Sequence, residues 1–388
     1  MGKRGAGAAV ACALTVGAIA SAIASATTGP GPVASGSRVA ERAAGPARRV
    51  SVIAGGDILT ESRVRTVAAA HGAATGARFD FDPLFAPVRP LIESADVAIC
   101  HMELPIGAAG GSYGNHGRSP YGGNLLVAPY EIAAAARSVG FDRCSTASNH
   151  AYDAGAGGVA STFEALAASG LGSAGTARSV AEAGPVHFTV DDIRVAHVSF
   201  TTGSNTVSPA ERWRLNLSRD PSVIAGQVAR ARADGAEIVL LSLHVTHEML
   251  PGPIAADHSL VTAIVRAAEV DAVFVHGPHV VQPFGFVGRT PVWWSLGNFV
   301  SEMGGPTAAG RYVDPRTGDG LLAVVEFVDM GGGDFYVDAR SIAICNEYAA
   351  RTVRAATVEL ARPDLPAGLR AEMQACLART RVVVPDVG

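Results

Sequence analysis

The chain has 388 residues, of which 48% are hydrophobic and 17% are charged, so it can bury a substantial core. A length of this order predicts one large domain or two small ones. The formal net charge of −4 argues against nucleic acid or an anionic membrane surface as the main partner, because binding to phosphate groups requires a basic face.

The N-terminus has the pattern of an export signal. Lys3 and Arg4 precede an apolar run that ends in a small-x-small motif at residues 24–26, of the kind that a signal peptidase accepts. We therefore predict a signal peptide over residues 1–26 and a secreted or extracytoplasmic protein. An uncleaved membrane anchor is the alternative, because the run approaches the about 20 residues that a membrane span requires. The Gly/Pro/Ser/Thr-rich stretch that follows predicts a flexible linker over residues 27–48.

From residue 49 onward, strand-like and helix-like segments alternate, which predicts an α/β domain with a largely buried sheet. Short apolar and β-branched runs predict strands at 50–54, 96–100, 141–145, 186–190, 194–200, 237–243, 272–275, 292–295, 320–328 and 335–344. Helices are predicted at 61–71, 83–94, 130–139, 158–168, 223–233, 254–268 and 366–381. We expect the domain to cover residues 49–348, followed by a C-terminal extension with one helix over 349–388.

Four cysteines follow the predicted signal peptide: Cys100, Cys144, Cys345 and Cys376. An even number outside the cytosol permits disulfides. Cys100 and Cys144 lie at or near the ends of apolar runs, however, so buried free thiols are an equal alternative.

Polar residues follow the carboxyl ends of five predicted strands. They are Asp57, then His101 and Glu103, then Asn149 and His150, then His244, His247 and Glu248, and lastly His276 and His279. In open α/β sheets, ligands bind outside the carboxyl ends of the strands, so five distant loops would meet in one cleft. Each cluster alone fits ordinary turn chemistry, but five together indicate a metal centre. Carboxylates with imidazoles suit Mn, Fe or Zn, as one ion or as two with a bridging carboxylate.

The motifs that carry these residues resemble those of the CapA (poly-γ-glutamate capsule synthesis) family, within the metallophosphoesterase-like, calcineurin-like superfamily. The similar segments lie at 55–58, 96–103, 147–153, 243–248, 276–282 and 295–299, the last reading Ser-Leu-Gly-Asn-Phe. They follow in the family's order and cover about residues 50–302. The resemblance implies a four-layer α-β-β-α sandwich of the metallophosphoesterase type.

The resemblance also implies roles for individual residues. The implied metal ligands are Asp57, Glu103, Asn149, His244 and His279. His150 is implied as a general acid/base or phosphate-binding residue. Asp153 either accepts a hydrogen bond that orients the His150 loop, which we favour, or contacts the substrate. Further candidates for the cleft are His101, His247, Glu248, His276 and Asn298. Arg118, in a loop at 107–124 whose composition fits a flexible lid, is a candidate to bind an anionic substrate group, and a solvated loop arginine is the equal alternative.

The sequence departs from the family's pattern around the last histidines. Gly277 stands where the family has a histidine, and His276 is shifted by one position. A one-residue shift is expected to turn the His276 side chain elsewhere, which would leave a two-metal site incomplete.

Three functions remain open. The first is an envelope protein of capsule or poly-γ-glutamate-type polymer synthesis or export, with a metal-dependent, phosphoesterase-like hydrolytic site for a phosphorylated or peptide substrate. The second is a non-catalytic component that binds an anionic polymer together with membrane synthase partners. The third is an epimerase-like, metal-dependent peptide-modifying enzyme of a natural-product pathway, against which the signal-like N-terminus argues.

Overall fold

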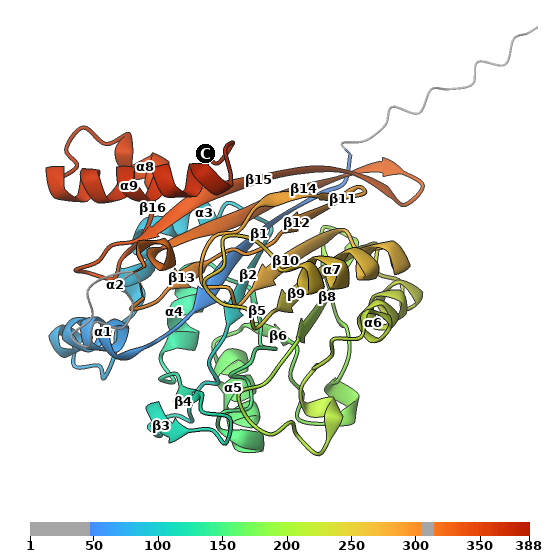
Figure 1. The fold of residues 1–388 in the computed structure, drawn as a ribbon, viewed down its shortest axis with the longest axis horizontal. Helices are drawn as coiled ribbons and strands as arrows, with labels where there is room; N and C mark the ends of the chain where they lie inside the picture. The colour runs from blue at the N-terminus through green and yellow to red at the C-terminus, as the bar shows by residue number, and fades with distance from the viewer. Residues whose placement is uncertain (1–46, 304–313) are drawn as a thin grey trace, which may run out of the picture. The chain divides into compact units, whose positions relative to one another are not determined.

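The computed structural model describes residues 47–303 and 314–388 (Figure 1). The predicted signal peptide at 1–26, and all but the last two residues of the predicted linker at 27–48, lie outside the described residues. None of the helices within the described ranges is long and apolar enough to cross a membrane.

Two β-sheets carry the fold. The first has the order β16-β15-β14-β1-β2-β5-β6, with β13 beside β1. Its strands are β1 (Arg49–Ile58), β2 (Val97–Met102), β5 (Arg143–Ser145), β6 (Gly172–Ala174), β13 (Asn298–Val300), β14 (Asp319–Gly331), β15 (Asp334–Asn346) and β16 (Val353–Ala355). The neighbours β1, β2, β5 and β6 run parallel, whereas β14, β15 and β16 are antiparallel. β16 thus continues the first sheet beyond residue 348.

The second sheet has the order β11-β12-β10-β9-β8-β7. Its strands are β7 (Val186–Val190), β8 (Ile193–Thr201), β9 (Ile238–His244), β10 (Ala272–His276), β11 (Phe284–Val287) and β12 (Thr290–Trp293). The core strands β8, β9, β10 and β12 are parallel to their neighbours in this group. The apolar segment at 237–243 is therefore a strand buried on both faces, as its composition indicates.

The alternation of side chains along the strands produces four layers. Val50, Val52 and Ala54 of β1 point to one face and pack with Ile238 and Leu240 of β9 between the two sheets. On the other face, Ile53 belongs to the core under the helices of the first half of the chain, and Val239 of β9 belongs to the core under α6 and α7. The order is helices, sheet, sheet, helices, which confirms the predicted α-β-β-α sandwich.

The outer layers contain most of the helices, which surround the sheets in Figure 1. Their bounds are α1 (Ser62–Thr75), α2 (Asp82–Phe85), α3 (Arg89–Ile92), α4 (Ile132–Ser138), α5 (Gly155–Ala168), α6 (Pro221–Ala233), α7 (Ala255–Ala267), α8 (Ala356–Leu360) and α9 (Ala367–Val383). The helix predicted at 83–94 is instead three short pieces, α2, a 3-10 turn at Ala86–Val88, and α3. Pro87 and Pro90 lack backbone N–H groups, so a continuous helix would lose hydrogen bonds there.

The region expected to be a flexible lid contains a two-stranded hairpin. β3 (Gly114–Arg118) pairs with β4 (Asn124–Val127), and Ser119 and Gly123 bond across the turn. The hairpin is tied to the main body because the Leu126 N–H donates to Asp153 Oδ2 at 2.8 Å.

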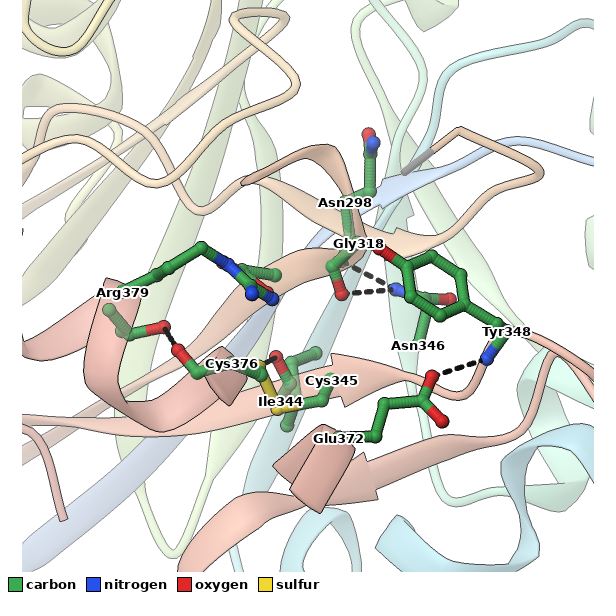
Figure 2. Close-up of a disulfide and its surroundings, with 11 residues drawn as sticks. Asn298, Gly318, Ile344, Cys345, Asn346, Tyr348, Glu372, Cys376 and Arg379 are labelled. Carbon is green, nitrogen blue, oxygen red and sulfur yellow. Dashed lines mark hydrogen bonds and ion pairs between the residues drawn. A yellow bond between two sulfur atoms is a disulfide. The ribbon is translucent and has the colours of Figure 1, made fainter. Parts of the chain in front are cut away.

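The four cysteines within the described residues form two pairs, so the free-thiol alternative does not hold. Cys100 on β2 is bonded to Cys144 on the neighbouring β5. Cys345 at the end of β15 is bonded to Cys376 of α9, which fastens the C-terminal helix to the first sheet (Figure 2). Beside this disulfide, the Asn346 amide donates to the carbonyl oxygens of Gly318 and Asn298 at 3.4 and 3.5 Å.

Candidate metal centre

The candidate metal centre lies where parallel strands of both sheets end. In the first sheet, Asp57 of β1 lies opposite His101 of β2. In the second sheet, His244 of β9 lies opposite His276 of β10. The His101 ring stacks on His276 with ring centroids 4.1 Å apart and on His244 at 5.2 Å. The Asp57–His101 pair of the first sheet therefore lies against the His244–His276 pair of the second sheet.

Asp57 belongs to two groups of metal-ligand atoms. Its carboxylate and ring nitrogens of His101 and His244 lie within 4.8 Å of one another, and the same holds for Asp57, Glu103 and His279. All five side chains are buried. A carboxylate that is common to two such groups is suited to bridge two ions.

Several buried polar atoms of this cluster find no hydrogen-bond partner among the described residues. They are Asp57 Oδ1, both carboxylate oxygens of Glu103, Asn149 Oδ1 and both ring nitrogens of His276. Leaving a buried polar atom unpaired costs about 1–3 kcal/mol. The oxygens and one ring nitrogen of a neutral His276 can each donate a lone pair, and mixed oxygen and imidazole donors suit divalent transition metals. The cluster therefore fits a divalent cation, and the choice among Mn, Fe and Zn stays a prediction.

The structure corrects the expectation for His276. Its side chain is not turned away, because Nδ1 lies 3.4 Å from Asp57 Oδ1 and the ring is fully buried. Gly277 has a φ of +98°, and a Cβ there would overlap the carbonyl oxygen of Val245. Its N–H instead donates to Asp57 Oδ2 at 3.1 Å. Position 277 therefore contacts Asp57 through its backbone, and the buried imidazole beside Asp57 belongs to His276.

His279 is held between three polar side chains. Its Nδ1 lies 3.1 Å from Asp57 Oδ2 and 3.0 Å from Asn298 Oδ1, and its Nε2 lies 3.7 Å from Glu103 Oε1. The backbone of His279 has a φ of +58°, a conformation uncommon for residues other than glycine. Burial lowers the pKa of His279, but Glu103 and Asp57 outweigh this and raise it well above its ordinary value.

The other ionisable groups are shifted by the same surroundings. Burial raises the pKa of Asp57, but the His276 and His279 rings beside it hold the value well below the ordinary one. Burial raises the pKa of Glu103 well above its usual range. Burial lowers the pKa of His101 well below the ordinary value, and it lowers the pKa of His244 to about 3. Both histidines are therefore neutral at pH 7, which is the form that binds a metal.

His150 lies at the edge of this cluster. Its Nδ1 lies 2.6 Å from Asp153 Oδ2, and its Nε2 lies 4.0 Å from Glu103 Oε1. The side chain of Asp153 is buried, so the imidazole is fixed with Nε2 as the atom that remains for proton transfer. Asn149, the preceding residue, donates from Nδ2 to Asn205 Oδ1 at 3.2 Å. Its own Oδ1 has no hydrogen-bond partner among the described residues.

Three other candidates lie outside both ligand groups. His247 Nδ1 lies 2.8 Å from Asp257 Oδ2, and Glu248 is exposed. Arg118 is exposed in the β3–β4 hairpin, where its Nη1 donates to the Gly122 carbonyl at 2.8 Å. Asn298, by contrast, contacts the centre directly, because its Oδ1 faces His279 and its Nδ2 donates to the Thr317 carbonyl at 2.9 Å.

Sequence reasoning missed two residues at the site. Asn205, in the loop after β8, has its Nδ2 3.2 Å from both ring nitrogens of His150. Ser145, at the end of β5, has its Oγ 2.7 Å from His101 Nδ1. Ser145 is the last residue of the strand predicted at 141–145, so a rule that considers only residues after a strand did not find it. Asn205 gave no such signal.

The comparisons with known proteins agree with the motifs. A model of the family described as bacterial capsule synthesis protein PGA_cap matches residues 51–303. The chain is 27% identical over 233 residues to the capsule biosynthesis protein CapA of Bacillus anthracis, an alignment that covers 58% of this chain and 56% of that protein. It is 25% identical over 285 residues to the PGA biosynthesis protein CapA of Bacillus subtilis (strain 168), with 73% and 69% coverage.

The chain thus spans little more than half the length of the first of these relatives. Among solved structures, the calcineurin-like phosphoesterase YfkN from Bacillus subtilis is similar with a TM-score of 0.44 and 12% sequence identity, covering 87% of this chain and 100% of that chain.

Proposed function

The chain belongs to the bacterial capsule synthesis protein family PGA_cap, and from this premise we propose that it is a metal-dependent hydrolase that acts on an anionic polymer of the cell envelope, or on its phosphorylated precursor. The synthesis or export of a capsule-type polymer is the process in which it would act. The names of the two Bacillus relatives, which refer to capsule and PGA biosynthesis, support this process.

The observation that carries the proposed chemistry is the position of Asp57 in both ligand groups. Asp57, His101 and His244 would hold one ion, and Asp57, Glu103 and His279 would hold another. His276 and Asn149 have unpaired buried atoms and would be further donors. A bound divalent ion would supply Lewis-acid polarisation of a phosphoryl group and a nucleophilic hydroxide at neutral pH.

The protein's own residues would provide the proton transfer. Asp153 fixes His150 through Nδ1, so Nε2 is the ring nitrogen that would protonate the leaving group or accept a proton. Asn205 contacts the same ring and restricts its rotation. Gly277 orients Asp57 through one hydrogen bond, and Asn298 orients His279 through its ring and its carbonyl oxygen.

The predicted signal peptide supports a location outside the cytoplasm, where membrane synthases would be the partners. This location and these partners are part of the proposal, as is the polymer substrate.

The test combines metal analysis with turnover. The purified protein, reloaded with Mn, is expected to retain metal and to hydrolyse bis-p-nitrophenyl phosphate. The His150→Ala variant is expected to keep its metal but to lose at least about 100-fold in kcat, since it removes a general acid/base. A metal-loaded protein that hydrolyses no phosphoester would contradict the hydrolase and favour the non-catalytic, polymer-binding component.

A further inference from the structure

We propose that Arg219 and His247 form an oxyanion subsite beside the metal centre, which binds a carboxylate or phosphate of the substrate next to the reacting group. The inference rests on the proposed function, because it assigns a binding site to the anionic substrate.

The position of Arg219 is set by hydrogen bonds that lead to a candidate metal ligand. The N–H of Thr202 donates to the His244 carbonyl at 2.9 Å. Arg219 Nε donates to the Thr202 carbonyl at 3.0 Å, and Nη2 donates to Thr246 Oγ1 at 3.0 Å. The guanidinium is therefore held by Thr202, which binds the His244 backbone, and by Thr246, two residues after His244.

His247 is fixed from the other side by a buried carboxylate. Its Nδ1 lies 2.8 Å from Asp257 Oδ2, and Asp257, in the first turn of α7, is 4% exposed. The His247 side chain itself is 36% exposed. The carboxylate therefore orients the ring, and Nε2 is the nitrogen that remains to meet a ligand.

The two side chains converge on the same carboxylate. Arg219 Nη1 lies 4.0 Å from Asp257 Oδ1, an oxygen that accepts no hydrogen bond from the part of the chain that the structure describes. Arg219 is 49% exposed, and its Nη1 donates to none of the described residues, so this end of the guanidinium can bind a ligand. A guanidinium with free donors next to an oriented imidazole is suited to an oxyanion.

The loop that carries Arg219 also borders the proton-transfer residue. The backbone N–H of Asn205 donates to the Asn149 carbonyl at 2.7 Å, and the Asn205 amide contacts His150. Residues 202–219 thus connect the His150 side of the centre with the Thr246 side. A substrate placed at the centre would lie along this loop, with a neighbouring acidic group within reach of Arg219.

The test measures binding, so that it does not depend on turnover. An oligomer of glutamate and inorganic phosphate serve as probes in calorimetric titrations of the full chain, with and without Mn. Arg219→Gln and His247→Gln are each expected to weaken oligomer binding at least about fivefold, with partial recovery in Arg219→Lys. Glu248→Gln, which removes a negative charge beside His247, is expected to strengthen it about twofold. Arg230→Gln is the matched control, because Arg230 is an exposed arginine of α6 that pairs with Asp234.

The outcomes separate the two proposals. Weaker oligomer binding with unchanged phosphate binding would assign a carboxylate to the subsite, and weakening of both would assign any oxyanion. Unchanged binding of both probes in Arg219→Gln and His247→Gln, or equal weakening in Arg230→Gln, would overturn the subsite. If the protein neither holds metal nor hydrolyses phosphoesters, the hydrolase fails, whereas a fivefold loss in the metal-free titration would still support the subsite.

Discussion

Asp57 lies directly opposite His101 across the parallel pairing of β1 and β2, although 44 residues separate them in the sequence. The same carboxylate lies 3.1 Å from the ring of His279. Asp57 is thus the residue that both ligand groups require. We expect Asp57→Asn to abolish metal binding at both groups, since an amide cannot carry the bridging negative charge. Elemental analysis by mass spectrometry measures the metal content per chain.

The control for this prediction is Asp329→Asn, which removes a carboxylate from a surface ion pair with Arg48. It should leave the metal content unchanged. Retention of a full complement of metal in Asp57→Asn would remove the basis for both ligand groups.

His276 provides a second prediction about the metal. Its ring is buried against Asp57 and His101, and neither of its nitrogens has a hydrogen-bond partner within the described residues. We expect His276→Ala to lower the metal content or to weaken metal affinity about 10- to 100-fold, the range known for residues that support a metal centre. Metal titrations followed by competition with a chelator measure this. Wild-type affinity in the variant would show that the ring only fills space.

Gly277 is expected to be essential for stability. Any Cβ at this position would overlap the Val245 carbonyl oxygen, and the φ of +98° is unfavourable for residues with side chains. We expect Gly277→Ala to lower the free energy of unfolding by about 2–4 kcal/mol, measured by urea denaturation. Gly285→Ala on β11 is the matched control, because a Cβ there meets no atom within 4 Å among the described residues. Equal effects of the two substitutions would contradict this account.

The sequence predicted the four-layer fold and the side chains that meet at the candidate centre, but not the pairing of every strand. The clusters at Asp57, Glu103, His244 and His279 were found because each follows a strand, and parallel strands bring such ends together. Which of the two sheets each strand joins depends on pairings between distant segments, and no local pattern encodes these. The short strands β6, β13 and β16 have three residues each, too few to show an alternation.

The contact of Asn205 with His150 and the position of the His276 ring both depend on how the chain turns after a strand. Asn205 reaches His150 only because the loop after β8 folds back onto Asn149. The position of His276 was misjudged from a one-residue shift along the sequence. In the structure, the left-handed backbone at Gly277 lets the chain turn directly after β10, so that both His276 and His279 face Asp57.

A pH dependence of stability is expected from His197, which lies on β8 between the sheets. Arg143 Nε donates to its Nδ1 at 3.3 Å, so Nε2 carries the proton and donates to Ser242 Oγ at 3.0 Å. Burial, together with the nearby charge of Arg143, holds the pKa of His197 well below its ordinary value of 6.5. Above pH 6.5 the residue is neutral in both states. As the pH falls below 6.5, the unfolded chain binds a proton that the folded protein does not, so stability decreases.

This effect is measured as a difference in slope. Between pH 6.5 and 4.5 the free energy of unfolding of the wild type should fall more steeply than that of His197→Gln, by up to about 1.4 kcal/mol per pH unit. His116→Gln, a substitution of an exposed histidine on β3, should leave the slope unchanged. Parallel curves for the wild type and His197→Gln would mean that His197 takes up its proton in the folded state.

The disulfide between Cys345 and Cys376 gives the last prediction. The two cysteines are 31 residues apart, and the bond fastens α9 to β15 (Figure 2). By the loop-entropy relation, a cross-link over this distance stabilises the folded state by about 3–4 kcal/mol, chiefly by restricting the unfolded chain. We expect Cys376→Ser to lose about this amount in urea denaturation under oxidising conditions. Cys345→Ser is the control and should lose the same amount, because both variants lack the same cross-link. A Cys376→Ser protein as stable as the wild type would indicate that Cys345 and Cys376 are not bonded in the purified protein. In that case the buried contacts of Met373 and Leu377 would hold α9 in place alone.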